Sequence, residues 1–497
     1  MVKPFELADF LADEIGKYSK FSKVERVMPG FINIYFSKDF FKEIISEIND
    51  SKNYGKINKN YKPKTINFEF ISANPTGELH VGHIRQGVIG DVSCRILEYL
   101  GNDVTRGYYL NDLGVQIENL AKSVYYYYLI ENKIKPTEEI ADYNTPEIKE
   151  FAKELFKRHG NKFCNEKISK EKAIIRFKDL SLNHFNELIK LRVKQLGIKE
   201  FDEWYSEKEI YSGDTAKNVL KSFADNKFSY KQDGALWLKT IDFGDEKDRV
   251  LIKKDGNQTY FLPDITNHYL KFASDKKYDL VIDLFGADHH GYEKRMFSAI
   301  NKMGFDESKF RIDFIQMVMI TDDGKVVKMS KRAGTSVRAV DMIQQLGKDL
   351  IRFYITDRSR EQHLELDMKS IESESFDNPY YYMQYSSARA NKLLNDANKI
   401  SSKVSLDDVY DSEFSRKLLI NMYTINNVLI SASEKNEPYI LNNYLREISS
   451  DFHKFYSNYK VIEDGKVYDE RVKIVSAYLK IFNLSTNLLG ITPMKKM

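Results

Sequence analysis

The sequence predicts an α/β fold with a Rossmann-like parallel-sheet domain, a C-terminal all-α domain and a short, truncated-looking α+β N-terminal domain. The main observation is the succession of a strand-like run, TINFEFIS at 65–72, a helical pattern from about Leu79 to Leu100, and a second strand candidate, DVTRGYYL at 103–110. Strand, helix and strand in this order are typical of parallel α/β units. Strand signals recur in GALWLKTIDF, DLVIDLFG and RIDFIQMVMI, and they stop after about residue 360, where amphipathic helical patterns take over.

These patterns divide the 497 residues into three predicted domains. Residues 1–60 form a small α+β unit that ends in the polar linker SKNYGKINKNYKPK, residues 61–360 form the α/β domain, and residues 361–497 form the helical domain. The range from about 115 to 225 is charged, mostly helical and without strand signals, which predicts a helical insertion. Its tyrosine run, YYYYL at 125–129, is interpreted as a buried helix face and not as a base-stacking surface.

Composition limits the class of protein. The net charge of +3 neither requires nor excludes a nucleic-acid partner, because a local basic patch can bind while the total stays near neutral. The two cysteines, Cys94 and Cys164, stand in unrelated contexts, which argues against a disulfide framework and a Cys-x-x-Cys zinc site. The N-terminus lacks the apolar core of a signal peptide, and no stretch has the roughly 18 consecutive apolar residues of a membrane span. We therefore expect a cytoplasmic protein without a membrane partner.

The turn after the first predicted strand is a candidate anion site. The stretch ISANPTGELHVGHIRQG, at 71–87, places His80 and His83 at the start of a helix, with Gly82 between them. Ligands gather at the carboxyl ends of parallel strands, and the N–H groups and dipole of the next helix attract anions. The two histidines are expected on one helical face, and Gly82 allows a flat base or sugar to approach the backbone. A packing role and a metal site stay open as alternatives, although further metal ligands are missing nearby.

A second motif, VVKMSKRAGTS, places Lys328, Ser330 and Lys331 in a loop after a strand. Taken alone it is weak, because lysine is common in this chain and a surface loop of mixed charge would look the same. Together, two segments predict a site that binds a triphosphate from two sides. One is the turn with His80 and His83 after the first strand, called the histidine turn, and the other is the loop with Lys328 and Lys331 after the last strand.

The two motifs together resemble those of the class I aminoacyl-tRNA synthetases. Further segments are similar to the arginyl-tRNA synthetase family in that family's order, and the likeness runs from about residue 25 to Met497. The segments are FEFISANPTGELHVGHIRQGVIGD, GYYLNDLGVQI, GALWLKTIDFGDEKDRVLIKKDGNQTYFLPDI, GADHHG and NPYYYMQYSSARA. The family's N-terminal domain is longer than residues 1–60, so the resemblance implies that this chain begins partway through it.

The resemblance implies an arginine–tRNA ligase. Such an enzyme uses ATP to activate L-arginine as arginyl-adenylate and transfers the arginyl group to the 3′-terminal adenosine of tRNA(Arg), releasing AMP and pyrophosphate. ATP would be a substrate that comes with Mg²⁺, and no zinc is expected. The implied catalytic residues are His80, His83, Lys328 and Lys331, and the implied ATP-binding residues are Gly82, Ser330, Gly286, Asp288 and His290.

The same resemblance implies an arginine pocket and tRNA contacts. Glu69 stands between Phe68 and Phe70 on a strand, so it points to the opposite face from both; without the resemblance, a strand acid that faces water is an equal alternative. Phe31 and Asn33 would contact the tRNA D-loop, weakly in so short a domain, and the helical domain would bind the anticodon. The implied arginine-binding residues are Glu69, Ser72, Asn74, Tyr260 and Asp264, and the anticodon candidates are Tyr385, Arg389 and Met497.

Two other functions remain as alternatives. Small nucleotidylyl-transferring enzymes also use a His-x-Gly-His turn, but they lack a large helical C-terminal domain. A tRNA-binding paralogue without catalysis would be expected to lose a signature histidine or lysine, and this sequence keeps them all. The family is usually monomeric, so we expect a monomer that binds tRNA(Arg), ATP and L-arginine.

Overall fold

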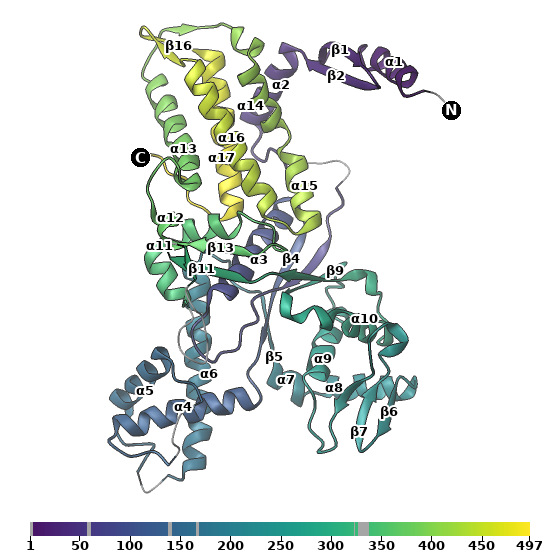
Figure 1. The fold of residues 1–497 in the computed structure, drawn as a ribbon, viewed down its shortest axis with the longest axis vertical. Coiled ribbons are helices and arrows are strands. Elements are labelled where there is room, and N and C mark those ends of the chain that lie inside the picture. The colour runs from purple at the N-terminus through teal and green to yellow at the C-terminus, as the bar shows by residue number, and fades with distance from the viewer. Residues whose placement is uncertain (1–2, 57–60, 138–141, 166–167, 323, 327–336) are drawn as a thin grey trace. The chain divides into compact units, whose positions relative to one another are not determined.

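The computed structural model describes residues 3–56, 61–137, 142–165, 168–322, 324–326 and 337–497 (Figure 1). The chain forms two compact units. One consists of residues 62–372 with 436–438, and the other of residues 1–61 with 373–435 and 439–497.

The larger unit is built on a five-stranded parallel sheet with the strand order β10-β9-β3-β4-β5. The first of these strands in the sequence, β3, lies at the centre, and the strand order reverses between β3 and β9. This reversal is the switch point at which a doubly wound sheet opens a crevice for ligands. The Rossmann-like parallel sheet predicted from the sequence is thereby confirmed. The strands are β3 (Thr65–Glu69), β4 (Asp103–Leu110), β5 (Glu203–Ser206), β9 (Leu280–Gly286) and β10 (Phe310–Ile315).

Helix α3 (Val81–Tyr99) connects β3 to β4 and is buried along most of its length. Its apolar residues recur at four-residue steps, as the sequence predicted, and Ile84, Val88 and Val92 are fully buried. Asp91 on the same helix is also fully buried, and its Oδ2 lies 2.6 Å from a guanidinium nitrogen of Arg352 on α11 (Ala339–Ile355). Although burial opposes ionisation, Arg352 and Arg95 hold the pKa of Asp91 below its ordinary value. The ion pair therefore joins the two helices inside the protein.

The insertion between β4 and β5 consists of α4 (Val115–Glu131), α5 (Pro146–His159) and α6 (Lys170–Gln195). Tyr125 and Tyr128 of the tyrosine run are buried and pack against Phe177. This confirms the interpretation of the run as a helix face. The expectation that the range 115–225 contains no strand was wrong for β5, a four-residue segment that pairs with β4. A strand this short, with all four side chains half-buried, lacks a clear alternation of apolar and polar residues.

Between β5 and β9 the chain adds a second layer. It consists of helices around a small antiparallel sheet, β6-β7-β8, and its core contains Phe223, Leu238 and Leu262. A separate sheet, β12-β11-β13, follows β10. The elements of these two parts are α7 (Glu207–Ser212), α8 (Asp214–Asp225), β6 (Ser229–Gln232), β7 (Ala235–Leu238), β8 (Arg249–Ile252), α9 (Phe261–Phe272), β11 (Val318–Asp322), β12 (Lys325–Val326), β13 (Leu364–Asp367) and α12 (Met368–Glu372). Helix α10 (Glu293–Lys302) lies between β9 and β10 in the sequence and packs on α9.

The smaller unit joins an N-terminal α-β-β-α segment to a bundle of helices. The N-terminal helix α2 buries Phe41, Ile45 and Ile48, and it packs on α14 and α17. Among the described helices, none is long and apolar enough to cross a membrane. The elements are α1 (Pro4–Ile15), β1 (Phe21–Val27), β2 (Phe31–Phe36), α2 (Lys38–Asp50), α13 (Pro379–Ala397), β14 (Lys403–Val404), α14 (Glu413–Tyr423), α15 (Ile425–Lys435), α16 (Tyr439–Asn458), β15 (Ile462–Glu463), β16 (Lys466–Tyr468) and α17 (Asp469–Leu489).

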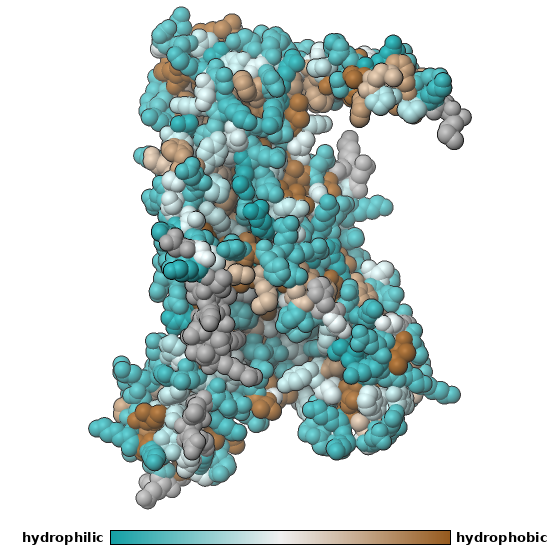
Figure 2. All heavy atoms as spheres, viewed as in Figure 1, coloured by the Kyte–Doolittle hydropathy of each residue, from teal (hydrophilic) through white to brown (hydrophobic). Residues whose placement is uncertain are grey.

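The face of the molecule in Figure 2 is mostly hydrophilic, but apolar side chains also reach the surface over the α1–β2 segment. Among them are Phe10, Met28 and Phe31, which are 61%, 69% and 66% exposed. Phe31 is one of the two predicted D-loop contacts; the other, Asn33, is also exposed on β2.

The buried ion pair gives a prediction about stability. Asp91→Asn removes the buried carboxylate that pairs with Arg352, which should lower the free energy of unfolding by about 3–5 kcal/mol. Urea unfolding followed by fluorescence measures this loss. The matched control is Asp214→Asn, whose exposed side chain pairs with Lys217 on the surface of α8 and should change the unfolding midpoint little. Equal midpoints for the two variants would contradict the assigned role of Asp91.

Candidate active site

A cavity of about 840 Å³ lies at the carboxyl ends of β3, β4 and β9, where the sheet has its switch point. The cavity brings together residues that are far apart in the sequence. Those predicted from the sequence are Glu69, Ser72, Asn74, His80, Gly82, His83, Tyr260, Asp264, Gly286 and Asp288. Lys328, Ser330, Lys331 and the side chain of His290 lie outside the part of the chain that the structure describes.

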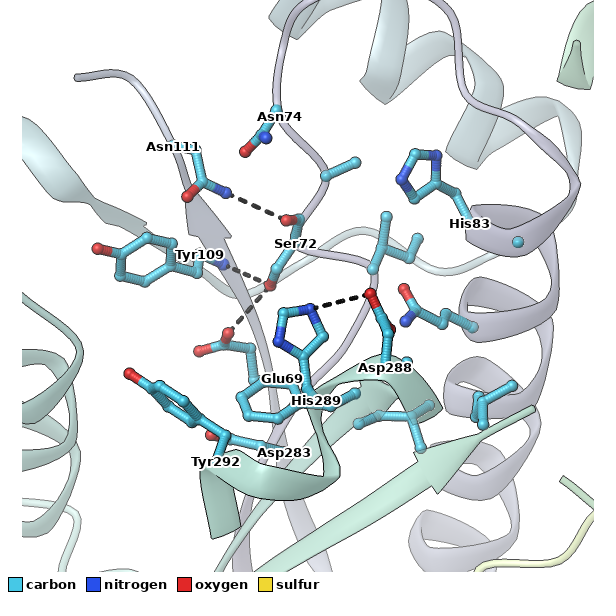
Figure 3. A pocket seen from close by; sticks show the side chains of 18 of the residues that line it. Glu69, Ser72, Asn74, His83, Tyr109, Asn111, Asp283, Asp288, His289 and Tyr292 are labelled. Atoms are coloured by element: carbon cyan, nitrogen blue, oxygen red, sulfur yellow. Dashed lines mark hydrogen bonds and ion pairs between the residues drawn. The ribbon is translucent and has the colours of Figure 1, made fainter. Parts of the chain in front are cut away.

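The chain turns sharply after β3 through two residues in the left-handed region. Ile71 has φ 70° and Ser72 has φ 43°, which is strained for a residue with a side chain, and above all for the β-branched Ile71. Ser72 is fixed in this conformation by its own hydroxyl, which donates to Glu69 Oε1 (3.0 Å) and accepts from the Tyr109 N–H (3.0 Å). Asn111 also donates to the Ser72 carbonyl at 3.1 Å, and Figure 3 shows these three contacts around Ser72.

The next residue of the turn is held from behind by a tyrosine. The hydroxyl of the buried Tyr108 accepts from the Ala73 N–H and donates to the Ala73 carbonyl, both at 3.0 Å. Tyr108 comes from β4, the neighbouring strand. The shape of the turn is therefore set by contacts from two strands as well as by the local sequence.

The two histidines lie where α3 begins. His80 is the N-cap residue, its Nδ1 accepts from the Gly82 N–H (3.1 Å), and His83 Nδ1 accepts from the His80 N–H (3.2 Å). The rings stack with their centroids 3.7 Å apart. Because both Nδ1 atoms accept hydrogen bonds, each neutral ring carries its proton on Nε2. The pair is thus prepared to donate hydrogen bonds from Nε2.

Gly82 is required first by the histidine beside it. A Cβ at position 82 would lie 3.0–3.1 Å from ring atoms of His80, so the missing side chain makes room for that ring. From the sequence alone, Gly82 is expected to let a flat base or sugar approach the backbone. The structure adds a packing reason within the turn itself.

Glu69 lies at the bottom of the cavity within a buried cluster of charges. Its Oε2 pairs with Lys271 Nζ at 2.8 Å, and Lys271 also pairs with Asp283 at 2.9 Å. His268 Nε2 bonds the other oxygen of Asp283 at 2.7 Å. Although burial opposes its charge, Asp283 and Glu69 hold the pKa of Lys271 above its ordinary value. The alternative that Glu69 is a strand acid facing water is therefore wrong.

Two further carboxylates, Asp264 and Glu207, line the cavity, and both have raised pKa values. Asp264 accepts a hydrogen bond from the Tyr292 hydroxyl, and burial raises the pKa of Asp264 to about 6. Glu207, at the start of α7, is buried, and burial with repulsion from Asp264 and Asp112 raises the pKa of Glu207 to about 7. Within the described residues, neither carboxylate has a cationic side chain as an ion-pair partner. Among the described residues, the cavity therefore presents two acids that no lysine or arginine pairs with, and the charge of His268 lowers the pKa of Asp264 less than burial raises it.

The loop after β9 forms another wall. A Cβ on Gly286 would lie 2.5 Å from Asp288 Oδ1, so a glycine at this position leaves space for that carboxylate. The Asp288 side chain is 81% exposed and faces His289, with its Oδ2 3.6 Å from His289 Nε2. Figure 3 shows both side chains on the short 3₁₀ helix that follows β9, opposite the turn that carries Ser72.

Comparison with known families then identifies the chain. Residues 44–376 match the family model described as tRNA synthetases class I (R), catalytic domain, and residues 383–497 match the DALR anticodon binding domain. The arginine–tRNA ligase of Staphylococcus carnosus is 36% identical over 98% of this chain and 88% of that ligase. This chain belongs to the class I arginyl-tRNA synthetase family. The Mesoplasma florum arginine–tRNA ligase is 33% identical, over 99% of this chain and 90% of its own length.

Solved structures agree with the family. A Campylobacter jejuni protein solved as a candidate arginyl-tRNA synthetase superposes with a TM-score of 0.82 at 31% identity, over 93% of this chain and 100% of that one. The Thermus thermophilus arginyl-tRNA synthetase has a TM-score of 0.77 at 17% identity, over 100% of this chain and 92% of its own. Because the sequence identity of this second match is only 17%, it supports the fold and not the function.

Several residues of the synthetase cavity were missed by sequence reasoning. They are Tyr109, Asn111, Gln116, Glu207, Asn267 and Tyr292. Tyr109, Asn111 and Gln116 stand in the segment GYYLNDLGVQI, which carried the family likeness, so the signal was there without a role for each residue. Glu207 has no such signal, because its place depends on the pairing of the short strand β5 with β4.

The predicted tRNA-binding residues lie in the other unit. Tyr385 and Arg389 are neighbours on α13, where the Arg389 guanidinium stacks on the Tyr385 ring at 4.1 Å and donates to its hydroxyl at 3.1 Å. Met497 is 60% exposed at the end of the chain. The tail before it runs along α13, since Gln384 accepts from the Met494 N–H and donates to the Thr492 carbonyl.

Tyr108→Phe tests how the turn after β3 is held. The phenylalanine fills the same space but leaves the Ala73 N–H buried without its partner, which should cost about 1–3 kcal/mol of the free energy of unfolding. Thermal and urea unfolding measure the loss. Tyr127→Phe is the control, because its hydroxyl bonds Asn144 at an exposed site and its loss should matter much less. A Tyr108→Phe variant as stable as the wild type would contradict this account of the turn.

Proposed function

We propose that this chain is an arginine–tRNA ligase that activates L-arginine with ATP and transfers it to the 3′ end of tRNA(Arg). The observation that carries the proposal is the unmatched pair of acids, Asp264 and Glu207, in the same cavity as the stacked histidines. One part of the cavity suits a cationic side chain, and another suits the phosphates of a nucleotide.

The acid pair favours a guanidinium over an ammonium group. A guanidinium presents a planar fork of donors that two carboxylates can accept at once, whereas an ammonium is a compact point charge. Asp264 and Glu207 come from two different helices, α9 and α7, so they can meet such a fork from two directions. Tyr292 stays a donor toward Asp264, since burial and the charge of Asp264 raise the pKa of its hydroxyl well above the ordinary value.

Glu69, Ser72 and Asn74 would orient the other end of the amino acid. Lys271 already balances part of the charge of Glu69 and Asp283, so these buried acids do not compete with Asp264 and Glu207 for the substrate cation. Asn74 is itself oriented by a hydrogen bond that it donates to Gln116 at 2.7 Å.

In the first step, an oxygen of the arginine carboxylate attacks the α-phosphorus of ATP, and the bond to pyrophosphate breaks. The Nε2–H groups of His80 and His83 would donate to phosphate oxygens that gain charge in the transition state. The N-terminus of α3 adds a positive dipole end next to them. By the family resemblance, Lys328 and Lys331 would balance the charge on the leaving pyrophosphate, Ser330 and His290 would help to hold ATP, and Mg²⁺ would enter bound to ATP.

In the second step, a ribose hydroxyl of the terminal tRNA adenosine attacks the carbonyl carbon of arginyl-adenylate, and AMP leaves. We assign the chemistry to the 61–360 domain, anticodon recognition to 361–497, and the D-loop contact of Phe31 and Asn33 to 1–60. Tyr385 and Arg389 form a stacked pair that suits a splayed base, with Met497 as a further contact. We propose that the enzyme acts as a monomer.

Asp264→Asn tests the substrate assignment. Loss of the charge-assisted bond to the guanidinium should cost about 1.5–3 kcal/mol, which lowers kcat/KM for arginine by about 10- to 160-fold. The KM for ATP should hardly change. The measurement is ATP–pyrophosphate exchange with each amino acid in turn, with and without tRNA(Arg), and the control is the exposed Asp275→Asn. Exchange by the wild type that does not depend on arginine, or an equal loss of ATP binding in Asp264→Asn, would overturn the proposal.

The raised pKa values of the two acids predict a pH dependence. Arginine needs both carboxylates ionised, so its affinity is present above their pKa values and is lost as the pH falls through about 7 for Glu207 and about 6 for Asp264. If both charges are needed, the affinity should fall by about 20-fold between pH 8 and pH 6. Calorimetric titration with arginine measures this change. In Glu207→Gln the dependence should shrink to the part near pH 6, and a profile like the wild type's would count against Glu207.

A further inference from the structure

We propose that Glu147, on the helical insertion, is a positioning residue that holds the histidine turn and the segment around Arg338 together. The inference rests on the proposed function, because it concerns the activation of arginine. Of the described residues, those that line the cavity include His80 but not Glu147, so Glu147 would act through its neighbours and not by touching the substrates.

The first contact of Glu147 is with the histidine turn. Glu147 lies in the first turn of α5, and its Oε1 accepts from the Glu78 N–H at 3.1 Å. Gly77 has φ 152°, and a Cβ there would lie 2.8 Å from the same carboxylate oxygen. Glycine at this position therefore allows the carboxylate to reach the backbone of the turn just before His80.

The second contact is with Arg338. Glu147 Oε2 lies 3.9 Å from an Arg338 guanidinium nitrogen, and Arg338 is further oriented by Asp341 through two hydrogen bonds of 2.8 Å. Arg338 also forms an isolated antiparallel bridge with His80, and the Ala339 N–H donates to the Leu79 carbonyl at 2.7 Å. One carboxylate thus contacts the backbone of one segment and the Arg338 side chain of the other, and the two segments are themselves paired next to His80.

A second side chain of the insertion fixes the same turn from α6. Arg192 Nε lies 3.0 Å from both carboxylate oxygens of Glu78, and both side chains are nearly buried. The insertion therefore reaches the histidine turn at two points, through α5 and α6. Because Arg192 anchors Glu78 already, removal of the Glu147 carboxylate should leave the fold intact and shift the turn relative to Arg338.

The experiment compares Glu147→Ala and Glu147→Gln in ATP–pyrophosphate exchange with arginine and tRNA(Arg) present. Glu147→Ala should lower kcat by about 10- to 100-fold, the scale of a small misplacement of catalytic groups. The KM for arginine should stay within about twofold of the wild type, because Asp264, Glu207 and Glu69 do not depend on this contact. Glu147→Gln keeps an oxygen for the Glu78 N–H but loses the pairing with Arg338, so its loss should be smaller.

The matched control is Glu150→Ala, an exposed acid on the same helix, which should have normal kinetics. A double-mutant cycle with Arg338→Met should show that the effects of Glu147→Gln and Arg338→Met are not additive. Thermal unfolding checks that the variants are folded. If Glu147→Ala does not fold, the kinetics of Glu147→Gln test the inference instead.

Three outcomes would overturn the inference: an unchanged kcat in a folded variant, a rise in the arginine KM in place of the fall in kcat, or additive effects in the cycle. Failure of the proposed function is distinct from each of these outcomes, because it would show as a wild type that has no arginine-dependent exchange at all.

Discussion

The left-handed backbone at Ile71 and Ser72 is the constraint on which the rest of the site depends. Each such residue costs on the order of 1–3 kcal/mol and persists only where its surroundings over-determine it. Here the surroundings are the Ser72 hydroxyl between Glu69 and Tyr109, the amide of Asn111, and the hydroxyl of Tyr108 on Ala73. The strain lies at the carboxyl end of the central strand, so it sets where the chain leaves the sheet and where α3 begins.

Charge balance within the cavity follows from that placement. Glu69 lies close to Asp283 on the neighbouring strand β9, and Lys271 is buried between them. Taking a lysine out of water is costly, and it is tolerated here because two carboxylates hold it. Among the described residues, neither Asp264 nor Glu207 forms an ion pair with a lysine or an arginine, and burial raises the pKa of both carboxyls. Within the described part of the cavity, these two carboxylates therefore offer negative charge that a substrate cation can balance.

The sequence predicted those elements of the fold whose residues form a recognisable pattern within a short stretch of the chain. The strand β3, the turn with His80 and His83, and the helix α3 could be read directly, because apolar periodicity and a helix start are local signals. The strand β5, the buried Lys271 and the acid Glu207 could not, because each depends on a partner far away in the sequence. Family likeness supplied Asp264 and Tyr260 as site residues, but it did not show that Tyr292 holds Asp264.

The insertion contacts the histidine turn and its neighbouring segment through two ion pairs of different strength, Glu78–Arg192 and Glu147–Arg338, and the two pairs have different roles. The Glu78–Arg192 pair is bidentate and nearly buried, so water and salt screen it little, and it anchors the turn. Glu147 and Arg338 are 3.9 Å apart, and the Arg338 side chain is 31% exposed, so their attraction is weaker and more easily altered. The weaker contact is the better place for the insertion to influence catalysis, because it can change without loss of the fold.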